Sequence, residues 1–328
     1  MKAELKFIIE NLNPKLLGLD KVSIYSFKKL GVGEGNLNYL FKIKNKKFIC
    51  RVNIDKGVPN KSKNEFESLK RVESLNIAPK AFYYHPKDKK FPYGFIILEF
   101  IEGKPLRMKK RTYTKKQVKQ IAFILAELHS KSCNGLPKKE YSFQYYLKHC
   151  EDYNKIINKH NDKLKKELVE IKNRIGNFLS KKEEHKFSLI HGDVCPQNIV
   201  ETKNGLKLID WESLQCSDPA KDIANILIDL ELKNSDLDLF LKDYQKIRKD
   251  PTILERAKTY AVLLRAVYFL WEITRSFEIL NKELPKEYLN KTTAQSHINE
   301  AKFQFRRLSE LIDVPKINID SLFTGAKN

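Results

Sequence analysis

The chain has 328 residues, of which 41% are hydrophobic, so it is long enough for two lobes or domains with a sizeable core. Its net charge of +21 is compatible with a polyanionic partner such as nucleic acid. The lysines, however, are spread along the whole chain, with no arginine-rich cluster and no aromatic-interleaved strand motif. A general bias towards lysine explains this charge more simply, and nucleic acid is not expected as a partner.

The cysteines and the apolar segments indicate a cytoplasmic protein. Five cysteines are scattered without a Cys-x-x-Cys pair, which predicts reduced thiols and argues against a disulfide frame or a zinc site. The first 19 residues are charged and interrupted by Pro14, so they are not a signal peptide. The most apolar run, residues 260–280, contains Arg265, Glu272 and Arg275, which predicts a buried helix and no membrane span.

The first hundred residues predict a small antiparallel sheet. An opening helix is expected over residues 3–19, and strands are expected over 24–30, 37–44 and 47–52. The turn between the first two strands is rich in glycine, which lacks a Cβ and lets the backbone approach phosphate groups closely. We predict that its nucleotide-binding residues are Gly31, Gly33, Gly35 and Asn36. Because a strand and not a helix follows, a dinucleotide-binding fold is disfavoured.

The rest of the chain predicts one more hairpin and then mostly helices. A helix over residues 62–75 is followed by strands over 82–84 and 94–98. Further helices are expected over 114–130, 141–184, 222–232, 236–250, 252–281 and 287–312. The region 141–184 is expected to be partly irregular near residues 160–162. We expect the tail, residues 314–328, to be a loosely held extension.

The stretch that indicates chemistry is residues 191–198, His-Gly-Asp-Val-Cys-Pro-Gln-Asn, followed twelve residues later by Asp210. Asp193 can accept a proton from an attacking hydroxyl group, while Asn198 and Asp210 offer the hard oxygen ligands that Mg²⁺ prefers. We therefore predict Asp193 as the catalytic residue and Asn198 and Asp210 as metal ligands of a phosphoryl-transfer site. For an isolated Asp-x4-Asn the simpler interpretation would be a solvated turn.

A predicted hairpin connects these residues. Residues 199–201 and 206–209 have the pattern of two short strands around Asn204-Gly205, a strong turn signal. A two-residue turn there would pair Ile199 with Asp210, and a bulged three-residue turn would pair Asn198 with Asp210. Either register predicts that the two metal ligands lie at the same end of one ribbon.

Together with residues 209–212 (Ile-Asp-Trp-Glu) and 218–224 (Asp-Pro-x-x-Asp-Ile-Ala), this stretch resembles the aminoglycoside phosphotransferase/choline kinase superfamily. Those enzymes share the protein-kinase-like fold. Residues 191–193 stand where protein kinases carry His-Arg-Asp, and residues 210–212 stand where they carry Asp-Phe-Gly. Recognisable pieces run from about residue 27 to residue 224.

The resemblance implies a cation on the third strand and a helix glutamate that pairs with it. Arg51 falls where kinases place their phosphate-binding lysine, and its planar guanidinium would contact phosphate oxygens in a bidentate way. A surface arginine on an edge strand is the alternative. Glu65 and Glu67 both compete for the glutamate position, and the spacing to Leu69 favours Glu65.

The resemblance also assigns the linker between the lobes and two downstream residues. Residues 98–103 would be this linker. Its residues from Glu99 to Ile101 would contact adenine through their main-chain groups. Asp222 matches an aspartate that braces the catalytic loop, although a carboxylate at a helix N-terminus is favoured by the helix dipole alone. We interpret His129 as a packed structural histidine.

The predicted fold is α+β: a two-lobed, protein-kinase-like fold with a small antiparallel-sheet lobe over residues 1–102 and a mostly helical lobe over residues 103–328. The expected function is Mg²⁺-dependent transfer of phosphate from ATP or GTP to a hydroxyl of a small metabolite or antibiotic. Residues 33–38 also resemble the flap of methylthioribose kinases, which lack an asparagine where this chain has Asn198. The alternatives are a non-catalytic nucleotide-binding protein and an RNA-associated protein on a kinase scaffold. The acceptor and the oligomeric state are left open.

Overall fold

The structure is a computed structural model, and it describes residues 2–32, 36–54, 60–89, 91–106, 112–136, 143–179, 187–232, 234–284, 289 and 292–323. The chain divides into two compact units, each built from three stretches. The first unit contains Met1–Leu128, His191–Leu214 and Asn234–Ile247, and the second contains His129–Ile190, Gln215–Lys233 and Arg248–Asn328. The predicted lobes, residues 1–102 and 103–328, are a different division of the chain from these two compact units. The lobe boundary between residues 102 and 103 stays a prediction.

A five-stranded antiparallel sheet organises the start of the first unit, as predicted. Its strands are β1 (Ile24–Val32), β2 (Asn36–Ile43), β3 (Lys46–Asn53), β4 (Ala81–His85) and β5 (Phe95–Glu99), in the order β1-β2-β3-β5-β4. Buried and accessible residues alternate along β3, because successive side chains of a strand point to opposite faces. This alternation places Phe48, Cys50 and Val52 in the core and directs Arg51 to the other face.

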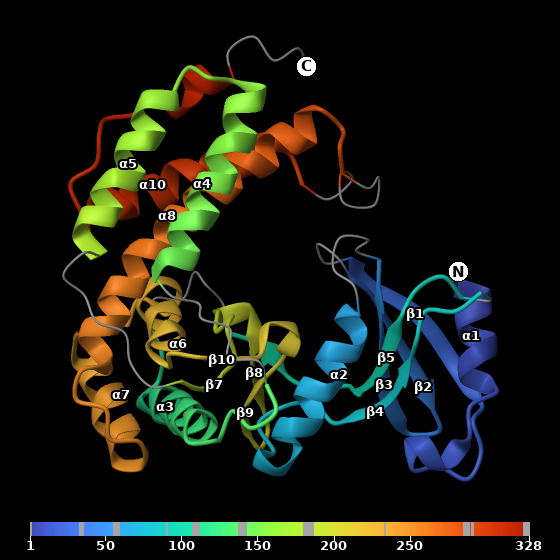
Figure 1. Ribbon diagram of the computed structural model, residues 1–328. Helices are drawn as coiled ribbons and strands as arrows, with labels where there is room; N and C mark the ends of the chain where they lie inside the picture. Colours follow the sequence, from blue (N-terminus) through green and yellow to red (C-terminus); the bar gives the residue numbers. More distant parts are fainter. Residues whose placement is uncertain are drawn as a thin grey trace. The chain divides into compact units, whose positions relative to one another are not determined.

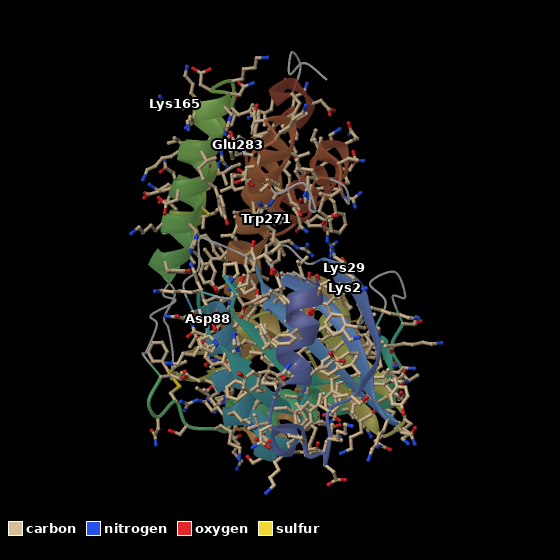
Figure 2. All side chains as sticks on the ribbon, turned by 90° about the vertical axis from the view of Figure 1, so that its right-hand side faces the viewer. Lys2, Lys29, Asp88, Lys165, Trp271 and Glu283 are labelled. Carbon is tan, nitrogen blue, oxygen red and sulfur yellow. A yellow bond between two sulfur atoms is a disulfide. The ribbon has the colours of Figure 1, made fainter. Side chains whose placement is uncertain are left out.

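Two helices flank this sheet. Helix α1 (Lys2–Glu10) and helix α2 (Lys61–Val72) cover its opposite faces (Figure 1). Leu5 and Ile9 of α1 pack into the core with stacked strand phenylalanines, and Lys2 and Lys29 are exposed (Figure 2). The predicted opening helix over residues 3–19 is too long. It stops at Glu10, and a separate 3₁₀-helix, Pro14–Leu17, follows because proline cannot continue a helix from within.

The first unit also contains the hairpin with the candidate site. Its elements are β6 (Lys104–Pro105), α3 (Lys115–His129), a 3₁₀-turn (Pro196–Asn198), β8 (Ile199–Thr202), β9 (Gly205–Leu208), a 3₁₀-turn (Trp211–Ser213) and α7 (Asn234–Ile247). Strands β6, β8 and β9 form a three-stranded sheet. The chain enters β6 past Gly103, where an added Cβ would lie 2.3 Å from the carbonyl oxygen of Glu201. Only glycine permits this close approach.

The second unit is mostly helical. It contains α4 (Phe143–His160), α5 (Lys165–Leu179), β7 (Ser188–Ile190), β10 (Gln215–Ser217), α6 (Ala220–Asn225), a π-helix (Ile226–Leu230), α8 (Ile253–Leu280), α10 (Ala294–Ser309) and a 3₁₀-helix (Ile319–Leu322). Figure 2 labels Lys165, where α5 begins, and Trp271 on α8. Helix α8 is buried on most of its surface, as expected for residues 260–280. Across the described ranges, no helix has the length and apolarity to cross a membrane.

Two helix predictions in this unit can be compared with the structure. The irregularity predicted near residues 160–162 is present, because α4 ends at His160 and α5 begins at Lys165. The helix expected over 222–232 begins at Ala220 and changes to π geometry from Ile226. The nearby buried guanidinium of Arg265 donates to the carbonyl of Ile228, a contact across 37 residues that no local pattern indicates.

The prediction of a loosely held tail is wrong for residues 319–323. Ile319 and Leu322 are buried, and the ring of Phe323 lies 4.8 Å from that of Phe277 on α8. The side chain of Asn161 donates to the carbonyl of Leu322 at 2.7 Å. Residues 324–328 lie outside the described residues. The docked segment therefore belongs to the second unit.

The prediction that all thiols are reduced is wrong for one pair. Cys133 and Cys216 form a disulfide across 83 residues of sequence. The bond joins the loop after α3 to β10, whose residue Cys216 pairs with Leu189 of β7. Cys50 and Cys150 are free and buried, and Cys195 is partly buried and not part of a disulfide.

Candidate active site

The hairpin has neither of the two predicted registers. Ile199 pairs with Leu208 and Thr202 with Gly205, so the two loop residues are Lys203 and Asn204. The hydroxyl of Thr202 accepts from the backbone N–H of Asn204 and donates to the carbonyl of Gly205, which closes the turn one residue early. The metal-ligand candidates still come together at one end of the ribbon, because the N–H of Ile209 donates to the carbonyl of Asn198 at 2.9 Å and Asp210 follows directly.

The loop before this hairpin is held by two side chains. The amide nitrogen of Asn198 donates to the carboxylate of Asp193 at 2.8 Å and to its carbonyl at 3.0 Å. The ring of His191 is fully buried, and its Nε2 lies 3.1 Å from the carbonyl of Ile209. The Nδ1 of His191 accepts from the N–H of Asp193 at 3.3 Å. These bonds fix the Asp193 carboxylate relative to the strand that leads to Asp210.

Asp210 has an unusual backbone conformation and a buried cationic partner. Its φ is +68°, in the left-handed region that asparagine and aspartate tolerate better than most residues. Its Oδ1 accepts from the Nη1 of Arg51 at 2.9 Å, and the same nitrogen donates to Glu65 at 2.7 Å. Glu65 is nearly inaccessible to solvent, whereas the Asp210 side chain is 31% exposed. One arginine therefore connects strand β3, helix α2 and the end of the hairpin.

Burial and charge act against each other in this cluster. Burial tends to lower the pKa of Arg51, but Glu65 and Asp210 outweigh it and raise that pKa, so the guanidinium stays charged. Burial raises the pKa of the Glu65 carboxyl to about 7, although Arg51 opposes that shift. Asp210 is the more solvated carboxylate and is the better candidate to exchange Arg51 for another cation.

Of the two glutamates considered as the partner of Arg51, Glu65 makes the contact. Glu67 lies on the exposed side of α2, where its carboxylate is 3.7 Å from the ammonium of Lys63. Sequence reasoning missed Asn38, whose side-chain oxygen accepts from the Nε of Arg51 at 3.2 Å. The signal that could have found Asn38 is the strand alternation, because Asn38 pairs with Arg51 across β2 and β3.

The Gly-rich turn is only partly described. Gly33 and Gly35 lie outside the described residues, while Gly31 belongs to β1 and pairs with Asn38. Asn36 begins β2 and is buried, and its amide nitrogen donates to Glu212 at 2.9 Å. Glu212 was not among the predicted site residues. The role of all four turn residues in phosphate binding stays a prediction.

A cavity of about 310 Å³ lies beside the Arg51 cluster. Its apolar lining includes Leu30, Ile49, Leu98, Val200 and Ile209. Arg51, Glu65 and Asp210 form a polar end, and Glu99 and Ile101 also line it. An apolar cavity of this size with a few convergent polar groups is typical of a small-molecule site. A larger hollow of about 680 Å³ includes none of the predicted catalytic or metal residues, so it is a weaker candidate.

Glu99, Phe100 and Ile101 of the linker line this cavity, and two of their backbone N–H groups are used within the fold. The N–H of Glu99 donates to the carbonyl of Lys80 at 2.8 Å, and the N–H of Phe100 lies 3.4 Å from the carbonyl of Lys47. The Glu99 carboxylate accepts from the N–H of Lys80 at 3.1 Å. The N–H and the side chain of Glu99 are therefore both used within the fold, and adenine binding by the main chain of Glu99 and Ile101 stays a prediction.

The predicted metal ligands are compatible with Mg²⁺. The Asn198 amide directs its nitrogen to Asp193, so its oxygen is the atom left for a cation, and Asp210 supplies a carboxylate. Hard oxygen donors in small number suit Mg²⁺, which usually keeps water and phosphate oxygens in its shell. In the described part of the chain, no group of three or more His, Cys, Asp and Glu side chains forms a ready-made metal site.

His129 and Asp222 lie together in the second unit. Both are fully buried, and the Nε2 of His129 is 3.1 Å from the carboxylate of Asp222. This contact agrees with the interpretation of His129 as a packed structural histidine. That Asp222 braces residues 191–198 stays a prediction.

Comparison with known proteins gives a family match and a shared fold. Residues 26–258 match the family described as "Phosphotransferase enzyme family". No curated protein sequence matches the chain. Among solved structures, the choline kinase of Streptococcus pneumoniae has a TM-score of 0.64 and 22% identity, with 88% of this chain and 95% of that chain covered.

Two further structures have similar scores. The choline kinase of Cryptosporidium parvum has a TM-score of 0.66 and 16% identity, over 94% of this chain and 97% of that chain. A spectinomycin phosphotransferase, solved with ADP and spectinomycin, has a TM-score of 0.61 and 15% identity, over 93% of this chain and 94% of that chain. At these identities the likeness shows the fold alone.

Proposed function

The chain belongs to the phosphotransferase enzyme family, and from this premise we propose that it transfers the terminal phosphate of ATP or GTP to a hydroxyl of a small molecule. The observation that carries this proposal is the joint position of two groups in one compact unit. Arg51, Glu65 and Asp210 form the polar end of an apolar cavity. Asp193 and Asn198 lie on the loop that leads into the same hairpin.

In this proposal each residue has a separate task. The apolar cavity and the main chain of Glu99 and Ile101 bind the base, and Arg51 neutralises phosphate oxygens. Asn198 orients the carboxylate of Asp193, which accepts the proton of the acceptor hydroxyl. Positioning and charge neutralisation provide most of the catalysis in phosphoryl transfer. Mg²⁺, held by Asn198 and Asp210, would supply charge neutralisation on the phosphates.

A small acceptor is favoured over a protein. In protein kinases a long segment after the metal-binding aspartate ends at Ala-Pro-Glu and forms the platform for a peptide. Here only eleven residues separate Asp210 from Asp222, α6 begins within them at Ala220, and Ala-Pro-Glu does not follow. Similar solved structures include a choline kinase and a spectinomycin phosphotransferase. We propose a hydroxylated metabolite or antibiotic as the acceptor.

The test uses labelled ATP and Mg²⁺ with a panel of choline, ethanolamine, aminoglycosides and other hydroxylated metabolites. The wild-type chain should label at least one small acceptor. Asp210→Ala should abolish turnover in a folded protein. Asp193→Asn should lose about 10²-fold or more in kcat with little change in nucleotide affinity. A wild-type chain that binds ATP but labels nothing would instead be a nucleotide-binding relative, and efficient labelling of proteins alone would contradict the small acceptor.

A further inference from the structure

Glu212, two residues beyond Asp210, is bound by side chains from two other segments. Its Oε2 accepts from the amide of Asn36 at 2.9 Å, and its Oε1 lies 3.0 Å from the ammonium of Lys61. Asn36 begins the strand that follows the Gly-rich turn, and Lys61 is the first residue of α2. The carboxylate therefore joins the start of β2 and the start of α2 to the hairpin end that contains Asp210.

Lys61 differs from the other lysines of its helix. Its side chain is 16% exposed, whereas those of Lys63 and Lys70 are 53% and 40% exposed. Lys61 precedes Glu65 by four residues, so both lie on one face of α2. The charge of Lys61 also reaches Glu65, whose carboxyl pKa it lowers against the larger effect of burial. Lys61 thus belongs to the Arg51 cluster and not to the solvated face of the helix.

The side chains of this cluster include fewer cations than carboxylates, so little positive charge is available for a nucleotide. Glu65, Asp210 and Glu212 are three acidic side chains, and among the described residues Arg51 and Lys61 are the cations that form ion pairs with them. A triphosphate would bring further negative charge into the same region, and Arg51 already shares one nitrogen between two carboxylates. Lysine binds phosphate as a mobile point charge on a flexible stem.

We propose that Lys61 is a second phosphate-binding cation of the nucleotide site, whose ammonium moves from Glu212 to the β- or γ-phosphate of the bound nucleotide. This inference rests on the proposed function, because it takes a nucleoside triphosphate as the ligand. Asn36 holds the other oxygen of Glu212, so the carboxylate remains anchored when Lys61 leaves it.

The test compares Lys61→Met with Lys63→Met in the full-length protein. Affinities for adenosine, ADP and ATP are measured by calorimetry with Mg²⁺, without any acceptor. Lys61→Met should weaken ATP binding by about 10- to 100-fold, the scale of one charge-assisted hydrogen bond, and leave adenosine binding unchanged. Lys63→Met should bind all three ligands like the wild type, and Lys61→Arg should recover most of the ATP affinity.

Glu212→Gln separates a phosphate contact from a structural role. If Lys61 only fixes Glu212, then Glu212→Gln should weaken ATP as Lys61→Met does, and this result would overturn the proposal. Equal weakening of adenosine and ATP by Lys61→Met, or unchanged ATP affinity, would also overturn it. A wild-type chain that binds no nucleoside triphosphate would contradict the proposed function itself, which is a distinct outcome.

Discussion

Arg51 in the first unit and Arg256 in the second unit each bind two carboxylates, but they use their guanidinium groups differently. Arg256 donates to Asp218 from Nε and Nη2, at 2.8 and 3.0 Å, and to Asp250 from Nη1 and Nη2, at 2.9 and 2.8 Å. Arg51 gives a single nitrogen to both Glu65 and Asp210. The Asp218 side chain is 2% exposed, whereas that of Asp210 is 31% exposed and lines a cavity.

This difference separates a structural ion pair from a site that can exchange its partners. Bidentate pairing with Arg256 satisfies both oxygens of Asp218, so this carboxylate has no oxygen left for another cation. A shared nitrogen and an accessible carboxylate leave Asp210 able to take a metal ion instead. For both arginines burial lowers the pKa, but the carboxylates outweigh it and raise the pKa, so the cation persists in each case.

The largest expected effect is on folding and lies at Arg256. Arg256→Met should lower the free energy of unfolding by about 3 to 5 kcal/mol, because Asp218 and Asp250 lose their buried partner. Denaturant unfolding followed by circular dichroism measures this loss. A variant as stable as the wild type would show that the network contributes nothing.

Arg51→Met should show the opposite pattern. The kcat at saturating nucleotide should fall about 10²- to 10³-fold, which is the scale of losing one preorganised electrostatic group. Stability should fall less than in Arg256→Met, because Glu65, with its pKa raised to about 7, can take up a proton when its partner is removed. Steady-state kinetics and unfolding of the same preparation provide both numbers. Unaltered kinetics with a large loss of stability would place Arg51 in the same class as Arg256.

Two glycines extend the comparison from charges to backbone packing. Gly103→Ala should destabilise the first unit by roughly 1 to 3 kcal/mol, because the new methyl group would lie against the carbonyl of Glu201.

Gly176→Ala in helix α5 of the second unit should stabilise that unit by up to about 1 kcal/mol. No atom from outside this part of the helix lies within 4 Å of the added Cβ, and alanine favours the helix over glycine. Thermal unfolding of the two variants tests the opposite signs, and a matching shift in both would contradict the packing argument.

A further expected effect, similar in size to that of Gly103→Ala, is a pH dependence from Glu65. Its folded-state pKa of about 7 lies above the ordinary value of 4.5, so the folded chain holds a proton that the unfolded chain has released. This contribution is fully present below about pH 4.5 and is lost as the pH rises through about 7. Glu65→Gln cannot titrate, so the stability difference between wild type and variant should change by roughly 1 to 3 kcal/mol between pH 4.5 and 8. A difference that is constant with pH would show that Glu65 is ionised throughout.

The sequence was informative where local pattern and chemistry agree. The predicted strand over residues 47–52 contains Arg51, and the family resemblance singled that residue out. Spacing along the helix together with the resemblance selected Glu65 on α2. Asp193, Asn198 and Asp210 lie in one short stretch, so their neighbourhood could be predicted without any long-range contact. Their chemical roles are still proposals.

The missed features depend on contacts between distant residues. The hairpin register is the exception, because it was wrong for a local reason: Thr202 closes the turn one residue earlier than the Asn-Gly signal indicates. The Asn36–Glu212 bond spans 176 residues, and the disulfide spans 83. No pattern within a window of twenty residues contains that information.

The docked C-terminal segment has a practical consequence for handling the protein. Ile319 and Leu322 fill apolar sites, and the carbonyl groups of Ser321 and Leu322 accept hydrogen bonds from Lys163 and Asn161 next to the start of α5. A chain shortened at residue 313 would expose the apolar surface that Ile319 and Leu322 cover, and this surface would favour aggregation. A shortened variant or an affinity tag should therefore leave residues 319–323 in place.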